Sequence, residues 1–161
     1  MSISPLLRHL GLGTETVWSA LLISHPWPQF ATVFEVGVHS AKQTLQAWRE
    51  GFSVHAFEPS PLSCKRIVKQ LRAAGAMDAG RAVTLHPRAV TARSGDTVHF
   101  ISVGGTGDHI TAASHNSVAV DTVAMDDIID TLRERIFLIK VDVQGGELAV
   151  FQGLHRSLAA R

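Results

Sequence analysis

The sequence has 161 residues, of which 45% are hydrophobic and 18% charged, and a formal net charge of +1. This length suits one domain with a buried core. The balanced charge, without a Lys/Arg-rich segment, favours neither a nucleic-acid partner nor an anionic membrane surface. No secretory signal or apolar segment of about 18 residues is found, and the single cysteine, Cys64, fits a reducing compartment. We therefore expect a cytoplasmic α/β domain.

The first 30 residues predict two short amphipathic helices, Pro5–Leu10 and Thr14–Ile23, separated by glycines. Two prolines in the segment 25–28 end this region, because proline cannot continue a helix. We interpret residues 1–30 as a helical arm that packs on a domain formed by residues 31–161.

A strand–helix–strand unit follows the arm. Apolar segments predict strands at Thr32–Val36 and Ser53–Phe57, and helical spacing predicts a helix at His39–Glu50. Each strand ends at an acid, Glu35 or Glu58, and parallel neighbours place both acids at the sheet edge where α/β proteins bind ligands. Because Glu58 lies about 20 residues beyond the glycine turn, the spacing typical of a ribose-binding acid, we expect a nucleoside-containing cofactor. The alternative for Glu58 is a solvent-facing loop carboxylate.

The rest of the chain predicts further alternation of helices and strands. The pattern indicates a helix at Pro61–Ala74 that Ser60 caps, with Gly51 ending the helix before it. The Val98–Val103 and Val118–Val123 segments alternate apolar and polar residues and predict a hairpin that joins or flanks the main sheet. The remaining expected elements are a strand at Ala82–His86, a helix at Asp126–Arg135, a strand at Phe137–Val141 and a helix at Glu147–Ala159.

The turn after the first strand carries Gly37, which permits a sharp bend before the N–H groups of the next helix. A dinucleotide fingerprint needs a second glycine two residues later, where this chain has His39. The turn therefore argues against NAD or FAD and favours a cofactor without phosphates that bears an ammonium, with His39 in reach of it. A plain strand-to-helix turn is the alternative.

Three charged residues cluster around the end of the strand Phe137–Val141. Lys140 lies within the apolar segment, Asp142 follows it, and Glu147 begins the next helix after two glycines. A buried ammonium needs a partner, and Asp142 or Glu147 would supply it in an ion pair that positions a substrate hydroxyl. Glu147 also suits a purely structural role at a helix N-terminus. No histidine pair has the i, i+4 spacing of a helical zinc site, so we expect no metal.

Three ordered motifs, Val33–Gly37, Ala56–Pro59 and Ile139–Glu147, together resemble the FkbM family of S-adenosylmethionine-dependent methyltransferases. The linking segments His86–Val90 and Val123–Asp127 are similar as well. The resemblance implies an α/β fold with a Rossmann-like class I methyltransferase sheet and flanking helices. It also implies O-methylation of a hydroxyl on a sugar or another small-molecule natural product.

The resemblance further assigns roles to individual residues. Asp142 would lie beneath the methyl group, with Lys140 and Glu147 as the other catalytic candidates. The cofactor would be bound by Glu35, Gly37 and His39 at its methionine end, Glu58 and Pro59 at the ribose, and Arg88 and Ala89 at the adenine.

The chain also departs from the family pattern. His39 replaces an Asn, Ala41 a Gly and Gln144 a Glu, and the strands that follow Phe137–Val141 in such enzymes are absent. An open apolar edge strand invites pairing, so we expect a second copy of the chain or another strand to cover it. The rival hypotheses are a degenerate methyltransferase fold without turnover and, less favoured, a nicotinamide-dependent oxidoreductase.

Overall fold

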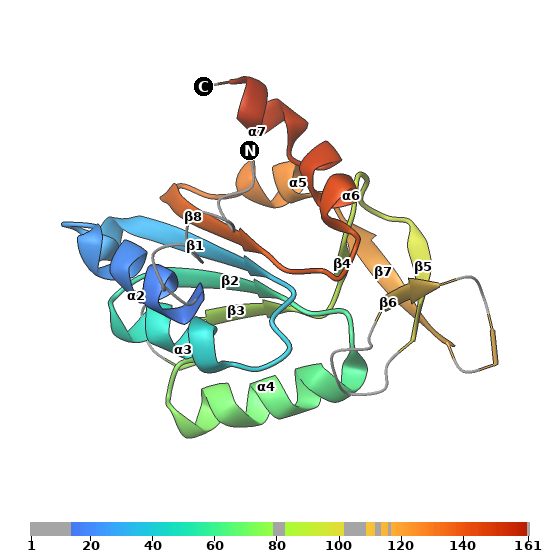
Figure 1. Ribbon diagram of the computed structural model, residues 1–161, viewed down its shortest axis with the longest axis horizontal. Helices are drawn as coiled ribbons and strands as arrows, with labels where there is room; N and C mark the ends of the chain where they lie inside the picture. The colour runs from blue at the N-terminus through green and yellow to red at the C-terminus, as the bar shows by residue number, and fades with distance from the viewer. Residues whose placement is uncertain (1–13, 79–82, 102–108, 112–113, 116, 161) are drawn as a thin grey trace.

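A computed structural model describes residues 14–78, 83–101, 109–111, 114–115 and 117–160. It contains two β-sheets that meet along one side of the molecule (Figure 1). The main sheet is parallel and has the order β3 (Val83–His86), β2 (Ser53–Phe57), β1 (Ala31–Val36) and β8 (Arg135–Val141). The second sheet has the order β4 (Ala89–Val90), β7 (Ser117–Val123), β5 (Thr97–Ile101) and β6 (His109–Thr111).

Strand β1 is the centre of the main sheet. All six of its residues are buried, and it pairs with β2 on one side and β8 on the other. Its alternate side chains enter two different cores: Val33 packs with the N-terminal helix, whereas Phe34 and Val36 pack with residues from the C-terminal part of the chain. A strand buried on both faces needs a nearly continuous apolar sequence, which β1 has.

Helices cover both faces of the main sheet (Figure 1). On one face lie α2 (Thr14–Ser24), α3 (Lys42–Arg49) and α4 (Pro61–Ala73), and a 3₁₀ turn, η1 (Pro28–Phe30), leads into β1. On the other face lie α5 (Met125–Ile129), α6 (Glu147–Gln152) and α7 (His155–Ala159).

Several local predictions are confirmed. The Ser60 hydroxyl caps α4 by accepting the Ser63 N–H at 3.2 Å, and Gly51 ends the α3 region with a φ of 99°. The predicted helix Thr14–Ile23 is α2, whereas Pro5–Leu10, Ala82 and residues 102–108 lie outside the described residues. The expected hairpin flanks the main sheet, with β6 inserted between β5 and β7 along the chain.

Two predicted helix boundaries are wrong. The helix expected from His39 begins at Lys42, because His39 has a left-handed φ of 49° that a helix excludes. The helix expected over Asp126–Arg135 ends at Ile129, and Arg135 instead begins β8 opposite Ala31. Pairing with the central strand thus overrides the helical pattern.

The closing helix predicted at Glu147–Ala159 is two helices that separate at Gly153. A Cβ atom at Gly153 would lie 2.2 Å from the backbone oxygen of Thr91, so only glycine permits this close approach. The Asp126 carboxylate then fixes the start of α7 by accepting the N–H groups of Arg156 at 2.9 Å and Ser157 at 3.0 Å. These bonds depress the pKa of Asp126 although burial opposes them.

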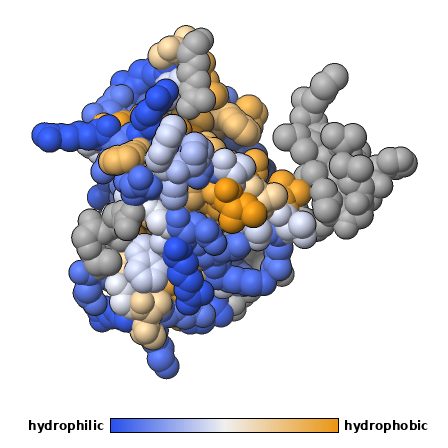
Figure 2. All heavy atoms as spheres, turned by 90° about the vertical axis from the view of Figure 1, so that its left-hand side faces the viewer, coloured by the Kyte–Doolittle hydropathy of each residue, from blue (hydrophilic) through white to orange (hydrophobic). Residues whose placement is uncertain are grey.

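Strand β8 forms one edge of the main sheet. In the described part of the chain it pairs with β1 alone, and most of its side chains are half-buried. Exposed apolar side chains also occur in the last turn of α2, at Ile23, and after it, at Trp27 and Phe30. Figure 2 views the end of the sheet where β1 begins and shows apolar residues at the centre of a mostly hydrophilic face. No helix among the described residues has the length and apolarity of a membrane span.

The carboxyl ends of β1 and β8 meet at Gly37. The Gly37 N–H donates to Phe57 O, and the Asp142 N–H donates to Val36 O, both at 2.9 Å. A Cβ atom at Gly37, whose φ is 84°, would lie 1.9 Å from the backbone oxygen of Asp142. Gly95 has nearly the same φ, 83°, but nothing within 4 Å of its Cβ position.

We therefore predict that Gly37→Ala destabilises the domain far more than Gly95→Ala. The shared left-handed φ costs about 1–2 kcal/mol in both variants, whereas the backbone clash at Gly37 raises the loss above about 4 kcal/mol. Urea unfolding monitored by circular dichroism measures both values. Equal losses in the two variants would contradict the close approach of Asp142 to Gly37.

Candidate functional site

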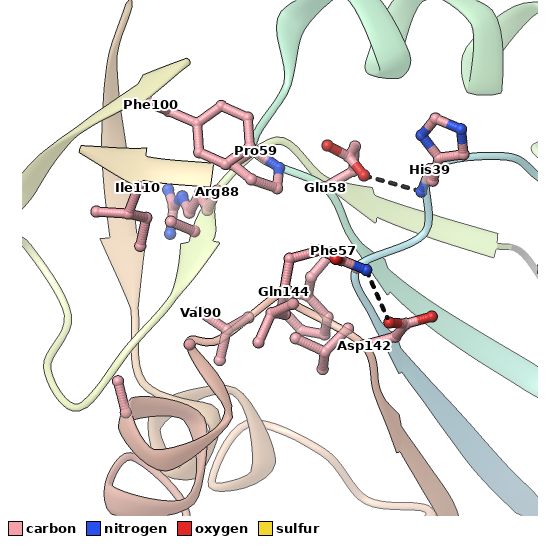
Figure 3. A pocket seen from close by; sticks show the side chains of 16 residues that line it. His39, Phe57, Glu58, Pro59, Arg88, Val90, Phe100, Ile110, Asp142 and Gln144 are labelled. Atoms are coloured by element: carbon pink, nitrogen blue, oxygen red, sulfur yellow. Dashed lines mark hydrogen bonds between the residues drawn. The ribbon is translucent and has the colours of Figure 1, made fainter. Parts of the chain in front are cut away.

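A cavity of about 180 Å³ lies where the strand ends of the main sheet face the second sheet (Figure 3). A buried water needs about 10–15 Å³ by the same measure, so the cavity admits a small organic ligand. Its walls come from four parts of the fold. They are Val36, Gly37 and His39 at the end of β1 and just after it; Phe57, Glu58 and Pro59 at the end of β2 and just after it; Arg88, Ala89, Val90, Phe100 and Ile110 around the second sheet; and Asp142, Val143, Gln144, Gly146 and Ala149 after β8.

Glu58 is a polar group of the cavity whose side chain is held by hydrogen bonds. The residue is only 5% exposed, and its carboxylate accepts the His39 N–H at 2.9 Å (Figure 3) and the Ser60 N–H at 2.8 Å. A carboxylate oxygen carries two lone pairs and can accept more than one hydrogen bond. The carboxylate is therefore oriented in advance to accept a pair of hydroxyl groups, which is the role that the sequence predicts for it.

The turn after β1 owes its shape to Gly37 and His39. His39 adopts a left-handed φ of 49°, which directs its N–H to Glu58, and its side chain lines the cavity. Asn, Asp and His adopt this conformation more readily than other side chains. The sequence predicted that His39 lies near the ligand but gave no sign of its backbone bond to Glu58.

An apolar wall faces Glu58 across the cavity. Val90, Phe100 and Ile110 contribute it from the second sheet, beside the Arg88 and Ala89 that the sequence predicted (Figure 3). An apolar wall suits a planar ring such as a purine base. The sequence analysis did not predict Phe100 and Ile110 as site residues, because the pattern alone does not place the second sheet beside the strand ends. Phe100 does belong to the alternating apolar pattern of the Val98–Val103 segment.

Asp142 and Gln144 form the rim of the cavity. The Asp142 side chain is 57% exposed, with the Gln144 Nε2 at 3.5 Å from Oδ1 and the Lys140 Nζ at 3.5 Å from Oδ2. Gln144 has a left-handed φ of 53°, which begins the turn into α6. The rim therefore carries an accessible carboxylate that is held by an ammonium and an amide.

Glu35 and Lys140 lie outside this cavity, on the face of β1 and β8 that α3 covers. They are register partners, and the Glu35 Oε1 is 3.7 Å from the Lys140 Nζ. The other oxygen, Oε2, accepts the Thr44 hydroxyl at 2.5 Å. Lys140 thus lies between two carboxylates: Asp142, one of the two partners that the sequence offered, and Glu35.

Glu147 also lies outside the cavity and holds its own turn. Its Oε1 accepts the Gly145 N–H at 3.2 Å, and its pKa is lowered by hydrogen bonds from its own backbone N–H and from that of Gly145. This is the arrangement of a residue that begins a helix. Of the predicted site residues, the structure therefore brings together Gly37, His39, Glu58, Pro59, Arg88, Ala89 and Asp142 in the cavity lining. Glu35, Lys140 and Glu147 lie outside it, although Lys140 contacts Asp142.

Burial raises the pKa of Glu35 to about 7, against the opposing effects of the Thr44 hydrogen bond and the Lys140 charge. Its Oε1 has no hydrogen-bond partner within the described part of the chain. An ionised carboxylate in this position is only partly compensated. Glu35 therefore carries a proton in a large part of the folded molecules near neutral pH.

The parallel sheet, with helices on both faces and a cavity at the strand ends, defines a Rossmann-like α/β domain. The family model of the methyltransferase FkbM domain matches residues 35–161, and the chain belongs to this family. A solved structure with a similar fold is the methyltransferase FkbM from Methylobacillus flagellatus, with a TM-score of 0.56 and 18% identity.

The match covers 83% of this chain but 31% of the Methylobacillus chain, so the sequence spans about a third of that protein's length. At 18% identity this likeness concerns the fold alone. No sequence among curated proteins matches the chain. The family model thus shows an FkbM methyltransferase domain, and the activity and substrates of this chain are a matter for proposal.

Glu35 predicts a measurable pH dependence of stability. Its folded-state pKa of about 7 lies above the ordinary 4.5, so the folded state retains a proton that the unfolded state releases between these values. Stability from this group is therefore fully present below pH 4.5 and is lost as the pH rises to 7, by about 3 kcal/mol. Glu35→Gln mimics the protonated acid and should gain that amount relative to the original chain over this interval.

Urea unfolding at several pH values measures the difference in free energy of unfolding between Glu35→Gln and the original chain. His86, whose pKa is lowered to about 4 chiefly by burial, acts in the opposite direction in both proteins and cancels. Glu50→Gln, which alters an exposed carboxylate at the end of α3, should keep the original profile. A pH-independent difference for Glu35→Gln would contradict a protonated Glu35.

Proposed function

We propose that the cavity binds S-adenosylmethionine and that the domain methylates a hydroxyl on a sugar or another small molecule. The observation that carries the proposal is the buried Glu58 carboxylate, held by the N–H groups of His39 and Ser60 at the end of β2. A ribose presents two neighbouring hydroxyls, which one carboxylate accepts in a bidentate manner.

The other cavity residues fit the remaining parts of this cofactor. The apolar side chains Val90, Phe100 and Ile110 suit the adenine, and the turn at Gly37 and His39 would receive the methionine end. The sequence predicted Glu35 at the methionine end as well, but Glu35 lies outside the cavity, so we assign the methionine end to the turn alone. S-adenosylmethionine has no pyrophosphate, so it does not need the second glycine that lets a pyrophosphate approach the backbone in dinucleotide-binding turns.

The cofactor would supply an electrophilic methyl group, which an acceptor oxygen takes in line as the bond between methyl and sulfur breaks. Asp142 would accept the hydroxyl proton, since its carboxylate stands exposed at the cavity rim. Lys140 and Gln144 hold this carboxylate in place from two sides. Correct placement of acceptor and methyl group supplies most of the rate enhancement in such a displacement.

A cofactor-binding domain without turnover is the second candidate. Gln144 favours it, because the family pattern has a glutamate at this position and an amide accepts no proton at neutral pH. Both candidates require the same cofactor site. Binding and methyl transfer are therefore separate measurements.

Calorimetric titration with S-adenosylhomocysteine tests the site. We expect micromolar binding, a loss of tenfold or more (about 1.4 kcal/mol) in Glu58→Gln, and a smaller loss in Ile110→Ala. Val118→Ala is the matched control, since Val118 is similarly exposed on the second sheet but lies outside the cavity lining. Thermal melts of each variant report whether it folds.

The proposed site would be contradicted if the folded chain did not bind S-adenosylhomocysteine, or if Ile110→Ala and Val118→Ala lost equal affinity for it. If S-adenosylhomocysteine binds, radiolabelled methyl transfer to a panel of hydroxyl acceptors distinguishes the two candidate functions. Transfer that Asp142→Asn reduces supports the enzyme. Binding without transfer to any acceptor supports the domain without turnover.

A further inference from the structure

A second hollow, of about 620 Å³, lies on the α2 side of the same sheet edge. It is bounded by α2, by the turn into α3 and by the open edge strand β8. Glu15, Leu21, Ser40, Lys42, Leu138 and Lys140 are among its walls. The cofactor assignment uses none of these residues.

Asp142 connects the two hollows. Among the described residues it alone lines both the cavity at the strand ends and the hollow beside α2. Its carboxylate is 57% exposed and is within 3.5 Å of the Lys140 Nζ, which faces the second hollow. A hydroxyl held in this hollow beside Lys140 would therefore meet the carboxylate that borders the cofactor cavity.

The charges of the second hollow occur in opposite pairs. The Lys42 Nζ contacts the Glu15 Oε1 at 2.6 Å, and Lys140 contacts Asp142. Each pair offers hydrogen-bond donors and acceptors together, while its net charge is close to zero. A phosphate or carboxylate placed beside either lysine would meet the partner carboxylate as well, which is unfavourable.

Apolar and uncharged polar groups lie between these pairs. Val17, Leu21 and Leu138 provide apolar surface, and Ser40 and Gln43 provide a hydroxyl and an amide. A neutral sugar ring has the matching chemistry, with hydroxyls at its edge and C–H groups on its face. Leu21 is 40% exposed, so the apolar surface is open to a ligand.

We propose that this hollow is the acceptor groove and that it takes a neutral, polyhydroxylated ring in preference to an anionic one. The proposal rests on the proposed function, since it places the reacting hydroxyl at Asp142 opposite the cofactor. It assigns acceptor selection to Glu15, Lys42 and the α2 surface, and leaves cofactor binding to Glu58 and the second sheet.

The test is nuclear magnetic resonance of the ¹⁵N-labelled chain, with and without S-adenosylhomocysteine. The probes are the methyl glycosides of glucose, mannose, galactose, rhamnose and fucose, with glucose 6-phosphate as the anionic comparison. We expect at least one neutral glycoside to shift amide signals of Val17–Leu21 and Ser40–Gln43 at millimolar concentration, and glucose 6-phosphate to bind more weakly. Lys42→Ala should weaken the glycoside by about fivefold.

Arg93→Ala is the matched control, because Arg93 is also the cation of an exposed ion pair, with Asp96 at 3.5 Å, and lies outside both hollows. It should leave the affinity unchanged. The proposal is overturned if no neutral glycoside shifts these amides, if glucose 6-phosphate binds more tightly, or if Lys42→Ala and Arg93→Ala act alike. Failure of the cofactor site appears separately, as the lack of shifts at the His39 and Glu58 amides on adding S-adenosylhomocysteine.

Discussion

The Glu58 carboxylate holds two turns of the main sheet at once. Its oxygens accept N–H groups from the turn after β1, at His39, and from its own turn before α4, at Ser60. Because the residue is nearly buried, a missing partner would cost free energy, so the two turns are fixed together. The left-handed conformation of His39 serves one of these hydrogen bonds, and the two bonds together orient the carboxylate into the cavity. Site geometry and chain path therefore depend on one side chain.

The second organising constraint is electrostatic and runs across the sheet. Lys140 lies between the buried Glu35 and the exposed Asp142, at 3.7 and 3.5 Å. With the pKa of Glu35 raised to about 7 by burial, much of the lysine's charge is directed at Asp142 near neutral pH. The sheet edge thus keeps one carboxylate accessible and one partly protonated near neutral pH. This separation gives two acids near one lysine different roles, as acid–base sites in enzymes commonly do.

Sequence patterns predicted the parallel core because β1 and β2 are apolar and are separated by a glycine turn and a helix. They also predicted Glu58 and Asp142, which line the cavity, from their position at strand ends. They grouped Glu35 with these acids, whereas the structure places it outside the cavity. An acid one residue before the strand end points to the opposite face, and the alternation of residues alone does not reveal where the strand stops. The pairing of Arg135 with Ala31 and the docking of the second sheet, which brings Phe100 and Ile110 to the site, are tertiary contacts that no local pattern records.

The central claim is that the cavity between the two sheets holds the nucleoside of S-adenosylmethionine on Glu58. A crystal structure of the chain with S-adenosylhomocysteine tests it most directly. The account predicts both ribose hydroxyls within hydrogen-bond distance of the Glu58 carboxylate, the adenine against Phe100 and Ile110, and the sulfur facing Asp142. A ligand bound elsewhere, or a ribose that makes no contact with Glu58, would contradict it.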